Sequence, residues 1–191
     1  TGEVMAVGRT LQESILKAVR SLEGGVGHIY MEKFNDCTEK ELLDYIRLGT
    51  DDRIFAIAEL MSRHTDLGQI ATATQIDMLF LDKICNIVRY EEEIKQRPWD
   101  PEILRKAKRR GFSDRAMAWL WKCTEREVYD RRRELGIFPV YKMIDTCASE
   151  FDSYIPYFYS TYEDENESVV SGNKKIIVLG SGPIRIGQGV E

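Results

Sequence analysis

Several features that mark common protein classes are missing from this sequence. No run approaches the roughly 18 consecutive apolar residues of a membrane span, so no membrane partner is expected. Histidine and cysteine are scarce and scattered, with no Cys-x-x-Cys pair. They are His28, His64, Cys37, Cys85, Cys123 and Cys147. We therefore predict neither a zinc site nor a disulfide framework, and the isolated thiols indicate a reducing, cytoplasmic setting.

Strong charge of one sign is also missing. Across 191 residues the net charge is −5, which disfavours a dedicated nucleic-acid binder. The hydrophobic content of 43% is ordinary for a globular protein, so extensive disorder is not expected.

Clear helix boundaries fill the middle of the chain. Three Thr-x-x-Glu capping boxes begin at Thr10, Thr38 and Thr124, and Asp100-Pro101 is typical of a helix start. Apolar residues recur at helical spacing after each signal. We expect helices over about 10–24, 38–49, 51–61, 75–96, 100–111, 113–121 and 124–136. In the longest, one inward stripe should hold Ile76, Leu79, Phe80, Ile84, Ile87 and Val88.

A basic helix pair suggests an alternative function. Residues 111–137 read as two short helices joined by a tight turn, which resembles a helix-turn-helix DNA-binding module. The segment from Glu102 to Glu134 contains eleven Lys or Arg and six Asp or Glu, so its local net charge is +5. Three acids on the second helix would repel phosphates, so a salt-bridged helix face is the better interpretation.

An aromatic and acidic segment follows the helices. Phe151, Tyr154, Tyr157, Phe158, Tyr159 and Tyr162 are followed by EDENE at 163–167. Stacking on single-stranded nucleic acid would require basic neighbours, which this segment does not have. We expect an extended stretch that docks through its aromatics and continues as an exposed acidic linker.

The two ends read as parts of other domains. Residues 174–191 predict a buried strand, a glycine loop and a helix start, as in the first strand of an α/β sheet. Such a sheet needs further strands, and residues 1–25 likewise cannot form a core alone. We therefore expect a piece of a larger protein.

Several runs in fixed order resemble one family. They are GEVMAVGRT at 2–10, RIFAIA at 53–58, IDMLFL at 76–81, KRRGFSD at 108–114, PVYKMIDTCASEF at 139–151, YSTYE at 159–163 and VLGSGPIRIGQGVE at 178–191. Together they resemble the large chain of carbamoyl-phosphate synthase at the junction of its two homologous halves. Only residues 25–40 contain nothing familiar.

The resemblance implies a mainly α fold flanked by truncated α/β pieces. Residues 1–25 would end the first ATP-grasp half, and 26–155 would form the all-α oligomerisation domain. Residues 156–173 would be the acidic linker, and 174–191 would open the second pre-ATP-grasp domain. The parent is an ATP-dependent ligase that makes carbamoyl phosphate from bicarbonate and glutamine-derived ammonia for arginine and pyrimidine biosynthesis.

The resemblance also implies that catalysis lies elsewhere. The ATP and magnesium or manganese sites of the family fall outside residues 1–191, so we expect no catalytic residue, cofactor or metal here. The chain alone should be inactive. Expected partners are the rest of the large chain, the glutaminase small chain and further copies of the enzyme. Residues that could line the carbamate route or a domain interface are Met5, Gly180, Gly182, Arg185, Gly187 and Gly189. Simple backbone geometry in a tight strand-to-helix turn explains these glycines equally well.

Overall fold

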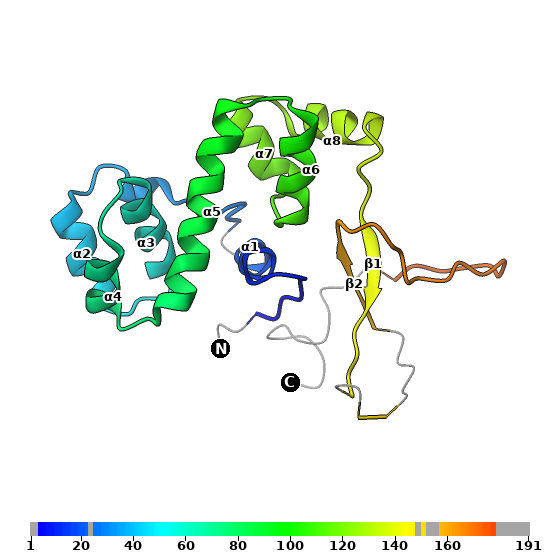
Figure 1. The fold of residues 1–191 in the computed structure, drawn as a ribbon, viewed down its shortest axis with the longest axis horizontal. Helices are drawn as coiled ribbons and strands as arrows, with labels where there is room; N and C mark the ends of the chain where they lie inside the picture. The colour runs from blue at the N-terminus through cyan, green and yellow to red at the C-terminus, as the bar shows by residue number, and fades with distance from the viewer. Residues whose placement is uncertain (1–3, 23–24, 148–149, 152–156, 179–191) are drawn as a thin grey trace.

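The computed structural model describes residues 4–22, 25–147, 150–151 and 157–178. These residues form a mainly helical fold with one small hairpin, which confirms the predicted fold class (Figure 1). The helices are α1 (Leu11–Ser21), α2 (Glu39–Arg47), α3 (Arg53–Ser62), α4 (Leu67–Thr74), α5 (Met78–Gln96), α6 (Pro101–Arg109), α7 (Asp114–Trp121) and α8 (Glu125–Glu134), with a 3₁₀ turn, η1, at Glu32–Phe34.

Capping side chains set most of the helix starts as expected. Thr38 and Thr124 form complete capping boxes with Glu41 and Glu127. Thr10 accepts a bond from the Glu13 amide, but the Glu13 carboxylate turns to the Arg9 amide instead of closing the box. Each cap satisfies backbone donors that the first helical turn leaves free.

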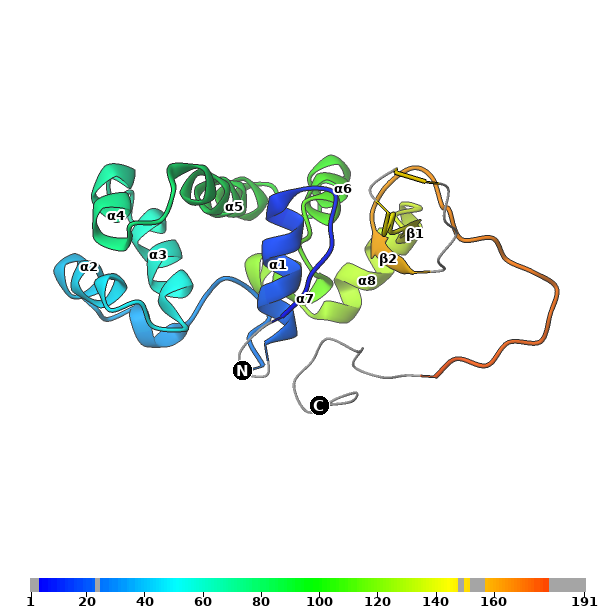
Figure 2. The same cartoon turned by 90° about the horizontal axis from the view of Figure 1, so that it is seen from below.

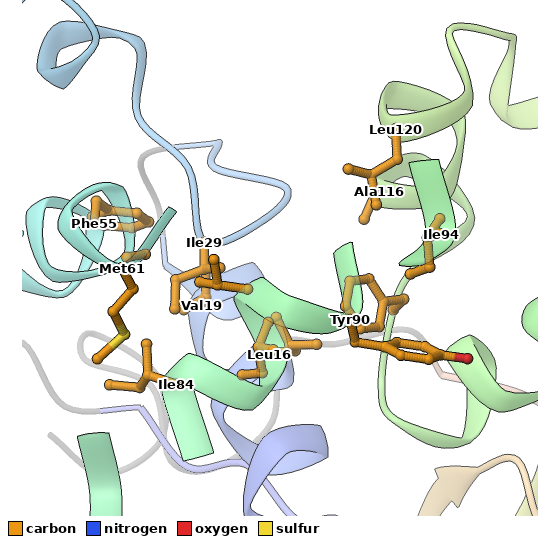
Figure 3. Packing of buried hydrophobic residues seen from close by; sticks show 14 of the residues in the cluster. Leu16, Val19, Ile29, Phe55, Met61, Ile84, Tyr90, Ile94, Ala116 and Leu120 are labelled. Carbon is orange, nitrogen blue, oxygen red and sulfur yellow. The ribbon is translucent and has the colours of Figure 1, made fainter. Parts of the chain in front are cut away.

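Helix α5 is the central helix of the fold and packs against helices on both of its sides. Figure 2 shows α2, α3 and α4 at one end of the molecule, α6 and α8 toward the hairpin, and α1 crossing the middle, while α7 packs against α5. The close-up in Figure 3 places Phe55 and Met61 on one side of α5 and Ala116 and Leu120 on the other. Leu16 of α1 is also buried in this core. Residues 11–21 therefore pack as part of the helical fold, although where the domain border lies stays a prediction.

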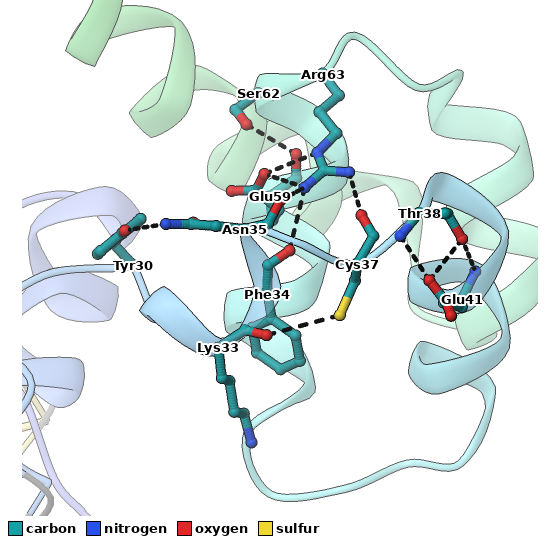
Figure 4. Close-up of polar contacts among 10 residues, drawn as sticks. All are labelled: Tyr30, Lys33, Phe34, Asn35, Cys37, Thr38, Glu41, Glu59, Ser62 and Arg63. Atoms are coloured by element: carbon teal, nitrogen blue, oxygen red, sulfur yellow. Dashed lines mark hydrogen bonds and ion pairs between the residues drawn. The ribbon is translucent and has the colours of Figure 1, made fainter.

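A single arginine fixes the connection between η1 and α2. The Arg63 guanidinium donates to the carbonyls of Cys37, Phe34 and Asn35, at 2.5, 3.1 and 2.9 Å (Figure 4). Its Nε donates to Glu59 at 2.7 Å. The end of α3 thereby holds the region in which the sequence showed nothing familiar.

Besides η1, a helix and a hairpin were not expected from the sequence. Helix α4 was missed, as was an antiparallel hairpin of β1 (Val140–Met143) and β2 (Phe158–Thr161) in which Val140 pairs with Thr161. The acidic stretch lies along the free edge of β1, because Asn166 and Glu167 accept bonds from the amides of Tyr141 and Met143. The predicted linker at 156–173 is therefore partly docked.

The predicted strand near the C-terminus is not formed in its described part. Residues 174–178 have no strand partner, and Ile176, Ile177 and Val178 are almost fully exposed. A strand without a neighbour leaves its backbone bonds unmade, which is the physical reason for this difference. Residues 179–191 lie outside the described part.

Candidate functional site

Two surfaces are candidates for function. One is the polar junction, defined here by Glu13, Lys17 and Arg20 of α1, Lys108 of α6, Asp114 of α7 and Arg132 of α8. The other is the neutral surface, defined by Gly68, Gln69, Thr72 and Gln75 on the outside of α4 and just after it, and Met78, Leu79 and Phe80 in the first turn of α5.

All residues of the polar junction except Arg132 line a cavity of about 310 Å³ between α1, the α6–α7 turn and the hairpin. Gly111 makes this close approach possible. It has φ +94°, and a Cβ there would lie 2.8 Å from the Glu13 Cα. Arg20 donates to the Gly111 carbonyl at 2.5 Å. The turn therefore requires glycine both for its backbone conformation and for its contact with α1.

Lys17 ties three segments together at the junction. Its ammonium group donates to the carbonyl of Val7 at 2.8 Å and to that of Ser160 at 2.5 Å. It also pairs with the buried Glu13 carboxylate at 2.9 Å. One side chain thus joins the segment before α1 to strand β2, which is 143 residues further along the chain.

A buried ion cluster lies under the hairpin. Asp114 accepts from both Lys108 and Arg132 at 2.7 Å, and all three side chains are largely buried. Burial lowers the pKa of Lys108 to about 8 despite the opposing charge of Asp114. Burial raises the pKa of Asp114, but the two cations outweigh it and lower this pKa overall. The ring of Tyr162, just after β2, lies 4.9 Å from the Lys108 ammonium group.

The neutral surface has far fewer charged residues than the rest of the chain. In a sequence with 31% charged residues, 67–81 contains a single charge, Asp77. The Asp77 side chain caps α5 by accepting from the Leu79 amide at 2.8 Å. Met78, Leu79 and Phe80 are 47%, 57% and 48% exposed.

This exposure corrects the sequence prediction for two residues. Leu79 and Phe80 were expected on the buried stripe of the long helix, but that helix begins at Met78 and its first turn extends beyond the core. Ile84, Ile87 and Val88, also predicted, are buried. Helical periodicity identified the apolar side chains but could not show where the covering helices end.

The basic helix pair forms as predicted, and contacts within the protein occupy the arginines of its second helix. All four arginines of α8 are engaged within the protein. Arg126 pairs with Asp130 at 2.8 Å and Arg131 with Glu134 at 3.2 Å. Arg132 is in the buried cluster, and Arg133 donates to the Tyr129 hydroxyl at 2.8 Å. Phosphate binding would have to break these contacts, so the structure favours the salt-bridged helix face.

The predicted route-lining residues are only partly described. Met5 is 56% exposed and lies before α1. Gly180, Gly182, Arg185, Gly187 and Gly189 lie outside the described residues, so their assignment stays a prediction.

In the part of the chain that the structure describes, no three His, Cys, Asp or Glu side chains gather as metal ligands would, and His28 instead pairs with the buried Glu91 at 2.6 Å. None of the described helices is long and apolar enough to cross a membrane. Whether the chain holds a cofactor stays a prediction.

Residues 3–136 match the family described as carbamoyl-phosphate synthetase large chain, oligomerisation domain. The match contains α1 through α8 and ends before β1, so the helical core and both candidate surfaces fall within it, apart from the hairpin contacts of the junction.

Proposed function

The chain belongs to the family of carbamoyl-phosphate synthetase large-chain oligomerisation domains, and we propose that it is the non-catalytic linking and association region of such an enzyme. The observation that carries this proposal is the match over residues 3–136, which contains the whole helical core. The parent would be a ligase, and this region would hold its parts together.

We assign to the parent enzyme the chemistry that the motifs at both ends suggest. It would use ATP with magnesium or manganese, bicarbonate and glutamine-derived ammonia to make carbamoyl phosphate for arginine or pyrimidine synthesis. A glutaminase small chain would be its partner, and it would act in the cytoplasm. Met5 and the 180–189 loop would border the carbamate route or a domain interface.

The polar junction supports the linking part of this proposal. Lys17 holds the segment before α1 and strand β2 against one helix. Arg109 of α6 adds an ion pair to Asp164, just beyond the hairpin. Segments that lead into and out of the helical core are therefore fixed relative to each other, as a rigid connector between two domains requires.

Association can be tested on the 191-residue chain by size-exclusion chromatography with light scattering over a concentration series. We expect a mass above the 22.1 kDa of one chain that rises with concentration. A constant mass of one chain at the highest concentration would contradict the association part of the proposal.

The absence of catalysis can be tested separately. With ATP, magnesium and bicarbonate, the chain should release no phosphate above a boiled control, because the proposal places the ATP sites outside it. Bicarbonate-dependent ATP hydrolysis that persists through purification would overturn the non-catalytic assignment.

A further inference from the structure

The polar junction carries more positive charge than its own carboxylates neutralise. It contains four cations and two carboxylates, so its net charge is +2. Glu13 pairs with Lys17, and a single carboxylate, Asp114, is shared by Lys108 and Arg132. Because these side chains are largely buried, charge that is not neutralised there is costly. The cluster therefore favours a further negative charge.

Arg20 is the cation of the junction that has no carboxylate partner among the described residues. Its guanidinium group donates to the Gly111 carbonyl, which leaves most of its five N–H donors for another acceptor. Burial lowers the pKa of Arg20, and the charge of Glu13 opposes this effect only in part. Arg20 in turn helps to lower the pKa of Lys108, so two like charges lie close together. An anion between them would relieve this repulsion.

A buried hydroxyl at the same cavity is also unsatisfied. Thr161 lines the cavity and is 1% exposed, yet its hydroxyl has no hydrogen-bond partner among the described residues. Because side chains alternate along a strand, Thr161 shares its side of β2 with Tyr159. The Tyr159 ring lies 5.4 Å from the Lys17 ammonium group. The unsatisfied hydroxyl therefore belongs to the side of the hairpin that faces α1.

We propose that this cavity binds a small dianion, through carboxylate or phosphate-type oxygen atoms, between Arg20, Lys108 and Thr161. Guanidinium and ammonium groups are the usual protein partners of such oxygens. The volume of about 310 Å³ lies at the lower end of the range of about 300 to 1,000 Å³ for small-molecule sites. The inference goes beyond the proposed function, because it assigns a ligand site that linking and association do not require.

The ligand would be a free anion from solution. Glu125, Tyr141 and Ser160 line the cavity and are exposed, so its mouth opens to solvent. The charge of Glu125 opposes anion binding, but water screens it at this exposed position. A bound dianion would contact α1, α6 and β2 at once and would thereby strengthen the connection that Lys17 already makes.

Nuclear magnetic resonance titration of the full 191-residue chain tests the proposal with two probes. Sodium sulfate represents phosphate-type oxygens and sodium succinate represents carboxylates, each added at neutral pH with sodium chloride adjusted to hold the ionic strength constant. We expect at least one probe to cause saturable shifts of the amide signals of Gly111, Ser113 and Thr161. With that probe, amide exchange in β2 should also slow.

Two variants at the site have a matched control elsewhere. Arg20→Gln should weaken binding about 10- to 100-fold, because it removes a charged donor. Thr161→Val should weaken binding about 2- to 10-fold without loss of stability in the free chain, since it keeps the shape and removes an unsatisfied hydroxyl. Arg89→Gln makes the same charge change at an exposed arginine that lines a separate cavity, and it should leave binding unchanged. Circular dichroism shows whether each variant keeps its helices.

Three results would overturn the inference. Equal weakening by Arg20→Gln and Arg89→Gln would indicate unspecific attraction of anions to the chain. Weakening by Arg89→Gln alone would place the anion in the other cavity. If neither probe causes saturable shifts in the wild type, the junction does not bind dianions. The proposed linking and association role would survive each of these results.

Discussion

At the scale of single residues, the buried charges of the junction depend on one carboxylate. Asp114 serves two cations, and replacing it with asparagine would leave Lys108 and Arg132 without a counter-charge in a largely buried place. Removing one partner from a buried ion pair costs about 3 to 5 kcal/mol of unfolding free energy. Asp114 therefore stabilises the fold by neutralising Lys108 and Arg132.

The lowered pKa of Lys108 predicts a specific pH dependence. Its ordinary value is 10.5, and burial brings the folded value to about 8 even with Asp114 beside it, while Arg132 and Arg20 lower it further. Between about pH 8 and 10.5 the unfolded chain keeps this proton and the folded chain releases it. The free energy of unfolding contributed by Lys108 therefore rises with pH in this window and is constant below it.

Urea unfolding of the wild type and Lys108→Met from pH 7 to 10 measures this effect. The wild type should gain stability relative to the variant as pH rises above 8. Stability curves that run parallel over the whole range would show that Lys108 titrates normally.

At the scale of elements, helix-capping residues explain which helices could be predicted from the sequence. Caps at Thr38, Asp100 and Thr124 marked helices because each side chain satisfies backbone donors within three residues. Helix α4 was missed because it is short and buries only Ile70 and Thr74, although its Asp66 cap could have been recognised.

The hairpin could not be found locally at all. Strands β1 and β2 are four residues each and are held by long-range contacts, including that of Lys17 to Ser160. Nothing in either strand's own sequence shows where its partner lies, since pairing is decided by residues far along the chain. Contacts at the polar junction, such as that of Lys17 to Ser160, could not be predicted from the sequence for the same reason.

Lys17→Met should loosen the hairpin and the segment before α1 together. Methionine keeps the apolar stem but loses the bonds to Val7 and Ser160 and the pair with Glu13. We expect a loss of about 2 kcal/mol in unfolding free energy, with faster amide exchange in β2. Urea unfolding and hydrogen exchange measure the two effects.

Lys106→Met is the matched control for that change. Among the described residues, Lys106 pairs only with Glu102 on the exposed side of α6, at 3.5 Å, and such a pair contributes about 0.3 kcal/mol. If both variants lose the same stability and neither changes exchange in β2, Lys17 does not tie the segments together.

At the scale of the whole molecule, the two candidate surfaces lie in different parts of the fold. The junction near the hairpin holds connecting segments in place, and the exposed apolar side chains of the neutral surface belong to the first turn of α5, next to α4 (Figure 1). The sequence alone placed Leu79 and Phe80 inside, because it could not show that α5 begins beyond the helices that cover its later turns. Their exposure shows that this apolar turn belongs to the surface of the described fold.

Sedimentation equilibrium on the purified 191-residue chain measures whether the helical domain associates with further copies. We expect a concentration-dependent equilibrium between one chain of 22.1 kDa and larger assemblies. A single species of one-chain mass at every concentration, with the helices intact by circular dichroism, would contradict it.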